Sequence, residues 1–131
     1  MKDTSMTEEI LLYIEEHLYH ELTLEKIAKE LHYSKFYMAR TFKEHTGLTL
    51  YQYIRGRRLD QAARMLTERK KSIAEIALEV NYSSQQAFTK AFRGTYGCTP
   101  QEYRRIGVYM PGQDRIFLRV RTDDIQGRMA A

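Results

Sequence analysis

The sequence has little of what breaks a helix, crosslinks a chain or crosses a membrane. Its 131 residues include two Pro, seven Gly, one Cys and no Trp. So few Pro and Gly favour long helices over an all-β architecture. The single Cys98 excludes an intrachain disulfide and a multi-cysteine zinc site, and is typical of a reducing compartment. No apolar run approaches the ~20 residues of a membrane span, and the N-terminus lacks the apolar core of a signal peptide. We therefore expect a cytoplasmic protein that does not contact a membrane.

Charge is distributed unevenly along the chain. Residues 1–34 carry three Lys/Arg and eight Asp/Glu, residues 35–71 carry ten and three, and residues 72–131 carry eight and six. A basic middle beside an acidic start suits a protein with one face for a polyanion. An ordinary solvated basic surface would have the same composition, so charge alone does not decide between the two.

Hydrophobic periodicity and helix-start signals predict an all-α fold of about seven helices. Each predicted helix follows a residue whose side chain can cap it, and four of these have Glu or Gln three residues later, the pattern of a capping box. The predicted caps are Ser5, Thr23, Ser34, Thr49, Ser72, Ser83 or Ser84, and Thr99, with the boxes at Ser5, Thr49, Ser72 and Thr99. Gly47 and Gly97 end two of the helices. The helix over residues 50–66 would be ~25 Å long.

One segment occurs twice. Residues 33–47 read YSKFYMARTFKEHTG and residues 82–97 read YSSQQAFTKAFRGTYG. The second copy aligns with the first at an offset of 49 residues, and of 50 residues after one extra residue in the second copy. In this alignment the apolar positions, the turns and the final Gly coincide. Each copy is a short helix, a tight turn and a longer helix, which is the layout of a helix-turn-helix. At the turns, His32 and Asn81 are residue types that tolerate positive φ. An array of helical hairpins for protein binding is the alternative, but two copies are fewer than such arrays usually need.

The second helix of each copy has one apolar face and one polar face. Met38 and Phe42 in the first copy, and Phe88, Ala91 and Phe92 in the second, are spaced to anchor the helix. The outer faces carry amides, a hydroxyl, cations and a methyl group. Groups of these types can contact the base edges in a major groove. The outer residues are Phe36, Ala39, Arg40 and Lys43 in the first copy and Gln85, Gln86, Thr89, Lys90 and Arg93 in the second. A solvated face is the alternative, and repetition at matching positions favours DNA.

Residues 8–106 resemble the DNA-binding domain of AraC/XylS-type transcription regulators. The segment that carries the resemblance is RRLDQAARMLTERKKSIAEIALEVNYSSQQAFTKAFRGTYGCTP, and the short chain with SQQ at the second reading helix is most similar to the MarA/SoxS/Rob group. The resemblance implies two helix-turn-helix units that bind double-stranded DNA as a monomer, with the reading helices in successive major grooves. It also implies contact with RNA polymerase, as an activator requires, for which the acidic first helix is a candidate.

The resemblance implies base contacts at Phe36, Ala39, Arg40, Gln85, Gln86, Thr89 and Lys90. As phosphate contacts we predict Ser34, Lys35, Tyr37, Lys43, Arg55, Arg57, Ser84 and Arg93. This sequence departs from the group at Phe36, where the group has Trp, at Ala39, where it has a polar amide, and at Lys90, where it has Arg. Asn81 replaces the usual Gly of the second turn. The first three changes affect which DNA sequence is recognised, and the last affects only the local geometry of the turn.

We expect a first helix-turn-helix subdomain over residues 5–48, a linker helix over 49–68 and a second subdomain over 69–107. Residues 108–131 form a tail in which 115–121 could be a short strand or an extended arm. No effector domain fits in residues 107–131, so the regulator is either controlled by its abundance or a fragment of a larger, effector-responsive one.

Two other functions compete with DNA binding. Cys98 could be a nucleophile or a methyl acceptor, but it occupies the position that matches Leu48, so we expect a packed residue and no enzyme. His17 and His20, beside Glu16 and Glu21, have a spacing that metals accept, but helix surfaces often carry such pairs. We therefore expect neither a metal nor a cofactor.

Overall fold

The helices follow the predicted order. The structure is a computed structural model that describes residues 2–109. Over these residues the chain forms seven helices and no strand: α1 (Lys2–Glu16), α2 (Leu24–Leu31), α3 (Lys35–Thr46), α4 (Leu50–Glu68), α5 (Ile73–Glu79), α6 (Gln85–Tyr96) and α7 (Pro100–Ile106). The all-α prediction is confirmed. The predictions for residues 110–131, including the strand or arm over 115–121, lie outside the described residues.

Local hydrogen bonds explain where most helices begin and end. The side chains of Thr23, Ser34 and Ser84 each accept a hydrogen bond from a backbone N–H in the first turn of α2, α3 and α6, respectively. Complete capping boxes occur at the starts of α4, α5 and α7, as predicted. His32 and Asn81 have φ values of 63° and 68°, which confirms the left-handed turn positions. The ambiguity between Ser83 and Ser84 is resolved in favour of Ser84.

The prediction of a cap at Ser5 is wrong. Ser5 lies inside α1, which begins at Lys2. No Pro or Gly precedes Ser5 to stop the helix, which therefore continues back to Lys2. Just after Ser5, Met6 and Thr7 are buried, and Thr7 Oγ1 lies 2.8 Å from His45 Nδ1, so this end of α1 packs against α3.

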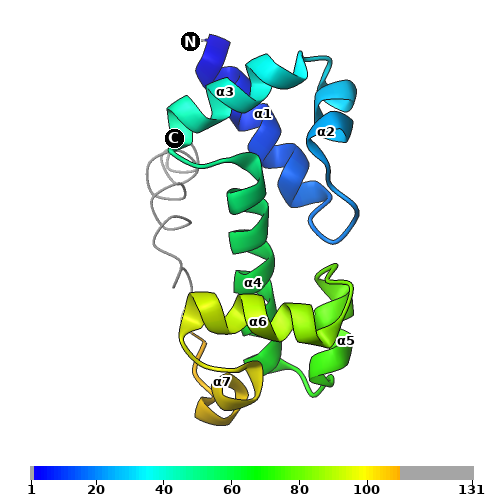
Figure 1. Cartoon of the computed structure of the whole chain (residues 1–131), viewed down its shortest axis with the longest axis vertical. Coiled ribbons are helices and arrows are strands. Elements are labelled where there is room, and N and C mark those ends of the chain that lie inside the picture. Colours follow the sequence, from blue (N-terminus) through cyan, green and yellow to red (C-terminus); the bar gives the residue numbers. More distant parts are fainter. Residues whose placement is uncertain (1, 110–131) are drawn as a thin grey trace.

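Helix α4 belongs to two hydrophobic cores (Figure 1). Its first half contributes Leu50, Tyr53 and Ile54 to a core with α1, α2 and α3. Its second half packs Leu59 and Leu66, with their neighbours, against α5, α6 and α7. The 19 residues of α4 span about 28 Å at 1.5 Å per residue. We call the two groups of helices the first unit (α1–α3) and the second unit (α5–α7).

The two cores repeat the same aromatic contact. Phe42 packs edge-on against Tyr53 at 6.0 Å between ring centroids, and Phe92 packs edge-on against Tyr103 at 5.4 Å. Each pair joins α3 or α6 to the helix that follows it. All four side chains are buried, so the repeat in the sequence is a repeat of core packing as well as of surface residues.

Candidate nucleic-acid interface

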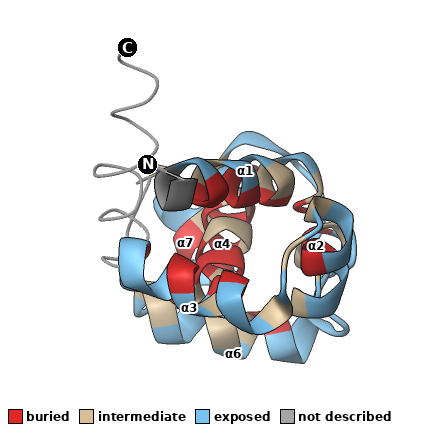
Figure 2. Cartoon of the chain, turned by 90° about the horizontal axis from the view of Figure 1, so that it is seen from above, coloured by how far each residue is buried: buried red, intermediate tan, exposed pale blue. Residues whose placement is uncertain are grey.

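Helices α3 and α6 lie on the same side of α4. Seen from above, both lie at one edge of the molecule, with α1 at the opposite edge (Figure 2). Their apolar faces are fixed, because Met38, Phe42, Phe88 and Phe92 are completely buried. The polar faces are therefore turned outward together, one at each end of α4 (Figure 1).

The outer face of α3 combines an aromatic ring with cations. Phe36 is 78% exposed, and Lys35 Nζ lies 5.1 Å from the centre of its ring. Arg40 is exposed, and its guanidinium lies 5.6 Å from the ring of Tyr37. Ala39 is half-buried beside it. A guanidinium positioned by an aromatic neighbour retains its donors for a ligand.

The outer face of α6 is built from amides and a cation. Gln85, Gln86 and Lys90 are exposed, and Thr89 is half-buried. The completely buried Phe88 anchors α6 in the second core, so the polar side chains of its outer face are carried by a rigid helix. None of the seven predicted base contacts in α3 and α6 is buried.

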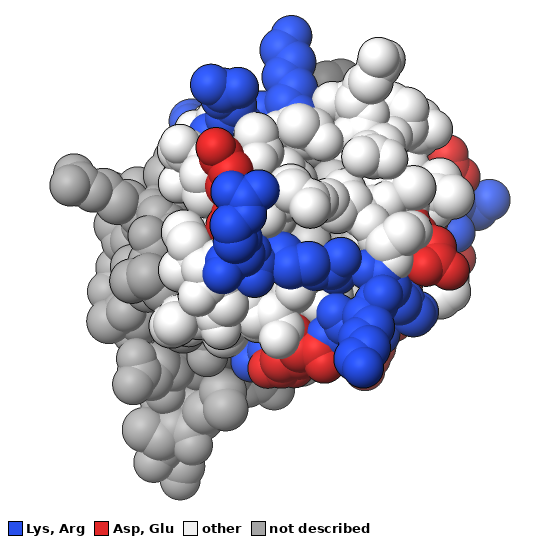
Figure 3. Space-filling view, turned by 90° about the horizontal axis from the view of Figure 1, so that it is seen from below, with Lys and Arg blue, Asp and Glu red and all other residues white. Residues whose placement is uncertain are grey.

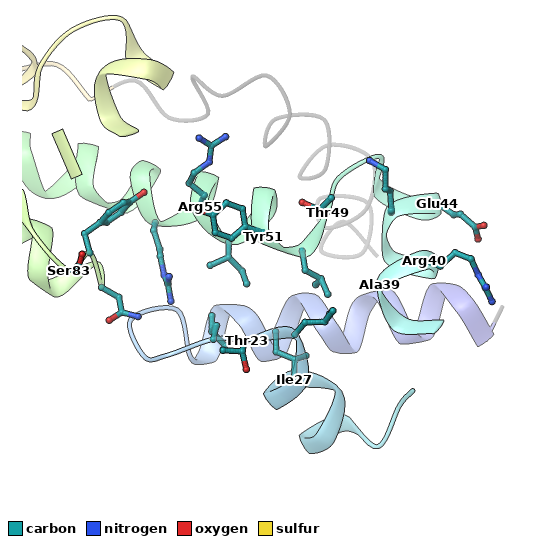
Figure 4. Close-up of a pocket in the computed structure, with 17 residues that line it drawn as sticks. Thr23, Ile27, Ala39, Arg40, Glu44, Thr49, Tyr51, Arg55 and Ser83 are labelled. Atoms are coloured by element: carbon teal, nitrogen blue, oxygen red, sulfur yellow. The ribbon is translucent and has the colours of Figure 1, made fainter. Parts of the chain in front are cut away.

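A groove of about 1210 Å³ lies between the two units (Figure 4). Ala39, Arg40 and Glu44 of α3 lie at one end, Ser83 lies at the other, and Tyr51 and Arg55 come from α4. Four cations line the groove against one acid, the cations being Arg40, Lys43, Arg55 and Arg58 and the acid Glu44. The Nε of Arg55 is buried and has no hydrogen-bond partner among the described residues. The groove therefore has the charge of an anion-binding surface.

The predicted phosphate contacts lie in different surroundings. Lys43 and Arg93 are exposed and Arg55 lines the groove, whereas Lys35 pairs with Glu25 at 3.2 Å on the surface. Ser34 and Ser84 are exposed, but their hydroxyl oxygens already accept hydrogen bonds from the first turns of α3 and α6. Each hydroxyl still has its own proton to donate to a phosphate oxygen.

Arg57 has a structural position that the sequence did not indicate. Its side chain is 12% exposed and binds Glu15 of α1 through two bonds, Nε at 2.6 Å and one terminal nitrogen at 2.7 Å. A second terminal nitrogen lies 3.2 Å from Asp60, which is 3% exposed at its side chain. Burial would lower the pKa of Arg57, but hydrogen bonding and charge from Glu15 outweigh it and raise the pKa. Arg57 therefore joins α1 to α4, and we do not include it among the proposed phosphate contacts.

Among the groove residues that sequence reasoning did not select are Tyr51 and Arg58. Tyr51 is 75% exposed at the start of α4, and Arg58 lines the groove two turns further along. The signal was present, because Tyr51, Arg55 and Arg58 have the four- and three-residue spacing of one helix face.

Some Lys and Arg side chains also lie at the end of the molecule formed by the second unit. Figure 3 shows Lys and Arg side chains across this end, with Asp and Glu among them. Arg69 and Lys71, in the loop between α4 and α5, both pair with Glu79, at 3.3 and 2.6 Å. Because these cations have acidic partners, this end carries less free positive charge than its Lys and Arg content suggests.

The residues of the competing hypotheses make ordinary contacts. Cys98 packs, partly buried, against the second core, as expected for the counterpart of Leu48. The ring of His17 stacks on Tyr13, and its Nδ1 lies 2.8 Å from the Tyr13 carbonyl oxygen. Residues 2–109 contain no group of three His, Cys, Asp or Glu side chains arranged to hold a metal ion. Within the same residues, no helix is long and apolar enough to span a membrane.

Comparison with known proteins gives a consistent result. A family model described as a helix-turn-helix domain matches residues 27–106. The chain is 45% identical over 102 residues to the transposon Tn10 TetD protein of Escherichia coli, covering 78% of this chain and 74% of that one. It is 38% identical over 104 residues to the regulatory protein SoxS of E. coli K12, covering 79% and 97%. It is also 38% identical over 105 residues to the right origin-binding protein of E. coli K12, but spans only 36% of that protein.

Solved structures share the fold. An AraC-type transcriptional regulator from Chromobacterium violaceum superposes with a TM-score of 0.75 at 27% identity, covering 79% of this chain and 93% of that one. The DNA-binding domain of AdpA, solved in complex with a target DNA, superposes with a TM-score of 0.72 at 28% identity, covering 76% and 90%.

Proposed function

The chain belongs to the AraC/XylS family of helix-turn-helix transcription regulators, and we propose that it binds one double-stranded DNA site with α3 and α6 in successive major grooves. The observation that carries this proposal is the shared orientation of the two reading helices at opposite ends of α4 (Figures 1 and 2). A relative of similar fold, AdpA, was solved with a target DNA.

The base contacts that we propose are the exposed residues of the two reading helices. Arg40 suits a guanine, Gln85 or Gln86 suits an adenine, and the methyl of Ala39 suits a thymine methyl. Phe36, Thr89 and Lys90 complete the two faces. Phosphates would be held by Ser34, Lys35, Tyr37, Lys43, Arg55, Ser84 and Arg93.

The length of α4 bears on the shape of the bound DNA. Two helices on one face of a duplex are separated by about 34 Å per turn, whereas α4 is about 28 Å long and is held in both cores. We propose that the duplex bends to reach both reading helices. Bending costs of order a few kcal/mol and makes affinity depend on base pairs that the protein does not touch.

We further propose that the protein is an activator that binds as a monomer and contacts RNA polymerase. Both units come from one chain, so two half-sites require no second copy. Glu9 and Glu16 are exposed on α1, and α1 lies at the edge of the molecule opposite α6 (Figure 2). An acidic surface there stays accessible while DNA is bound. This function needs no catalytic step and is exercised on DNA in the cytoplasm.

Selection from a random DNA pool, followed by salt-titrated binding, tests the proposed function. We expect an enriched two-part site, bound more tightly than a scrambled duplex, with log affinity falling steeply as log salt rises. Arg105→Ala, an exposed cation of α7, is the control and should bind like the original protein. Equal affinity for every duplex, or binding insensitive to salt, would overturn the proposal.

A further inference from the structure

The turn between α1 and α2 contacts the second unit. The carbonyl oxygen of His20 accepts a hydrogen bond from Arg58 at 2.7 Å and another from the side-chain amide of Asn81 at 3.2 Å. Arg58 Nε also donates to the carbonyl oxygen of Leu18 at 2.9 Å. A carbonyl oxygen has two lone pairs, so both bonds at His20 can form together. The contact joins residues 61 positions apart in the sequence.

The backbone conformation at Asn81 does not by itself require an asparagine. Its φ is 68°, a value that Gly reaches with less strain. The same position in the first unit is His32, with φ 63°. In the described part of the chain the His32 side chain forms no hydrogen bond to the second unit. Asn81 thus provides the turn conformation and, in addition, a donor that reaches the other unit.

The position of Asn81 connects this hydrogen bond to α6. Only Tyr82 and Ser83 separate Asn81 from Ser84, the cap of α6. Asn81, Tyr82 and Ser83 also line the groove between the units. The bond to His20 links the turn before α6 directly to the first unit, whereas α4 joins the two units through its place in both cores.

We propose that Asn81, through the His20 carbonyl that Arg58 holds in place, is a positioning residue that sets the separation and angle of the two reading helices. This inference rests on the proposed function for its biological meaning. Its consequence is selectivity for the spacing between half-sites, a property that contacts within either half-site do not determine. Asn81 touches no base in this proposal.

The first experiment measures the geometry without DNA. Spin labels are placed at Lys29→Cys of α2 and Gln101→Cys of α7, both exposed, in a Cys98→Ala background whose folding is checked by circular dichroism. We expect one narrow distance distribution, and a broader or displaced one after Asn81→Gly, which keeps the turn and removes only the donor. His32→Gly is the matched control and should leave the distribution unchanged. An unchanged distribution in Asn81→Gly overturns the inference.

The second experiment measures spacing selectivity on the selected site, with one base pair inserted or removed between the half-sites. We expect the original protein to lose about tenfold or more in affinity, and Asn81→Gly to lose clearly less while binding the original spacing with similar affinity. Identical losses would overturn the inference. If the original protein prefers no duplex, the proposed function fails, and the distance measurement still decides whether Asn81 positions the units.

Discussion

The two units share one scaffold and differ in the chemistry of their outer faces. In α3 that face holds Phe36, Ala39 and Arg40, whereas in α6 it holds amides, a hydroxyl and Lys90. The buried anchors stay equivalent, with the same edge-on aromatic pair in each core. The comparison shows that packing constrains one side of each reading helix and leaves the other free to vary.

The units also hold their turns by similar means. Arg58 of α4 donates to the carbonyl oxygens of Leu18 and His20 in the turn before α2. Arg104 of α7 donates to the carbonyl oxygens of Leu66, Arg69 and Lys71 before α5. The turn before α2 also accepts a hydrogen bond from Asn81 of the other unit, so the two units are alike in local design and are joined at this turn.

The largest expected effect tests the equivalence of the two cores. Phe42→Ala and Phe92→Ala each remove a completely buried ring and should lower the free energy of unfolding by about 3–5 kcal/mol. Because α4 lies in both cores, we expect a single transition in urea for either variant, followed by circular dichroism. Two separated transitions, with only the mutated unit destabilised, would show that the units fold independently.

The next effect separates a buried ion pair from an exposed one. Arg57→Met leaves Glu15 and the buried Asp60 without their cation and should cost about 2–3 kcal/mol in unfolding free energy. Arg69→Met, which removes an exposed pair in the second unit, should cost less than about 1 kcal/mol. Equal costs in urea unfolding would contradict the structural role given to Arg57.

Binding to the selected site distinguishes the contributions of the two outer faces. Arg40→Ala in α3 and Gln86→Ala in α6 should each weaken specific binding by about 1–3 kcal/mol and relax the preference at a different half-site. Binding to a scrambled duplex should change much less. If Arg40→Ala weakens every duplex equally, Arg40 contacts a phosphate and the first unit reads fewer bases than proposed.

The smallest effect concerns a tyrosine at the end of the described chain. Burial, reinforced by the charge and hydrogen bonding of Asp60, raises the pKa of Tyr109 to about 12. A raised pKa means that its stabilising contribution is present below the ordinary tyrosine value near 10 and is lost as pH rises through about 12. Ultraviolet titration of the original protein minus Tyr109→Phe should therefore show one phenol titrating late, and a difference centred near 10 would contradict the contact with Asp60.

Much of the fold was predictable because its signals are local. Capping boxes at Thr49, Ser72 and Thr99, and left-handed turns at His32 and Asn81, depend on hydrogen bonds and sterics within a few residues. The Ser5 prediction failed because a capping pattern competes with helix continuation, and no Pro or Gly before Ser5 stops the helix. The helical spacing correctly placed the predicted base-contact residues off the buried faces of α3 and α6.

The sequence by itself determined the order of the helices, most of their caps and the repeat of two units, since each depends on neighbours along the chain. The tertiary structure decided which partner each cation has within the protein. Arg57 and Arg58 are adjacent and chemically alike, yet one is held by Glu15, 42 residues away, and the other by the carbonyl oxygens of Leu18 and His20. The same holds for Asn81, whose partner is 61 residues away. Contacts between residues so distant in sequence form only when the cores at the two ends of α4 bring the helices together. The spacing of residues in the sequence therefore does not predict them.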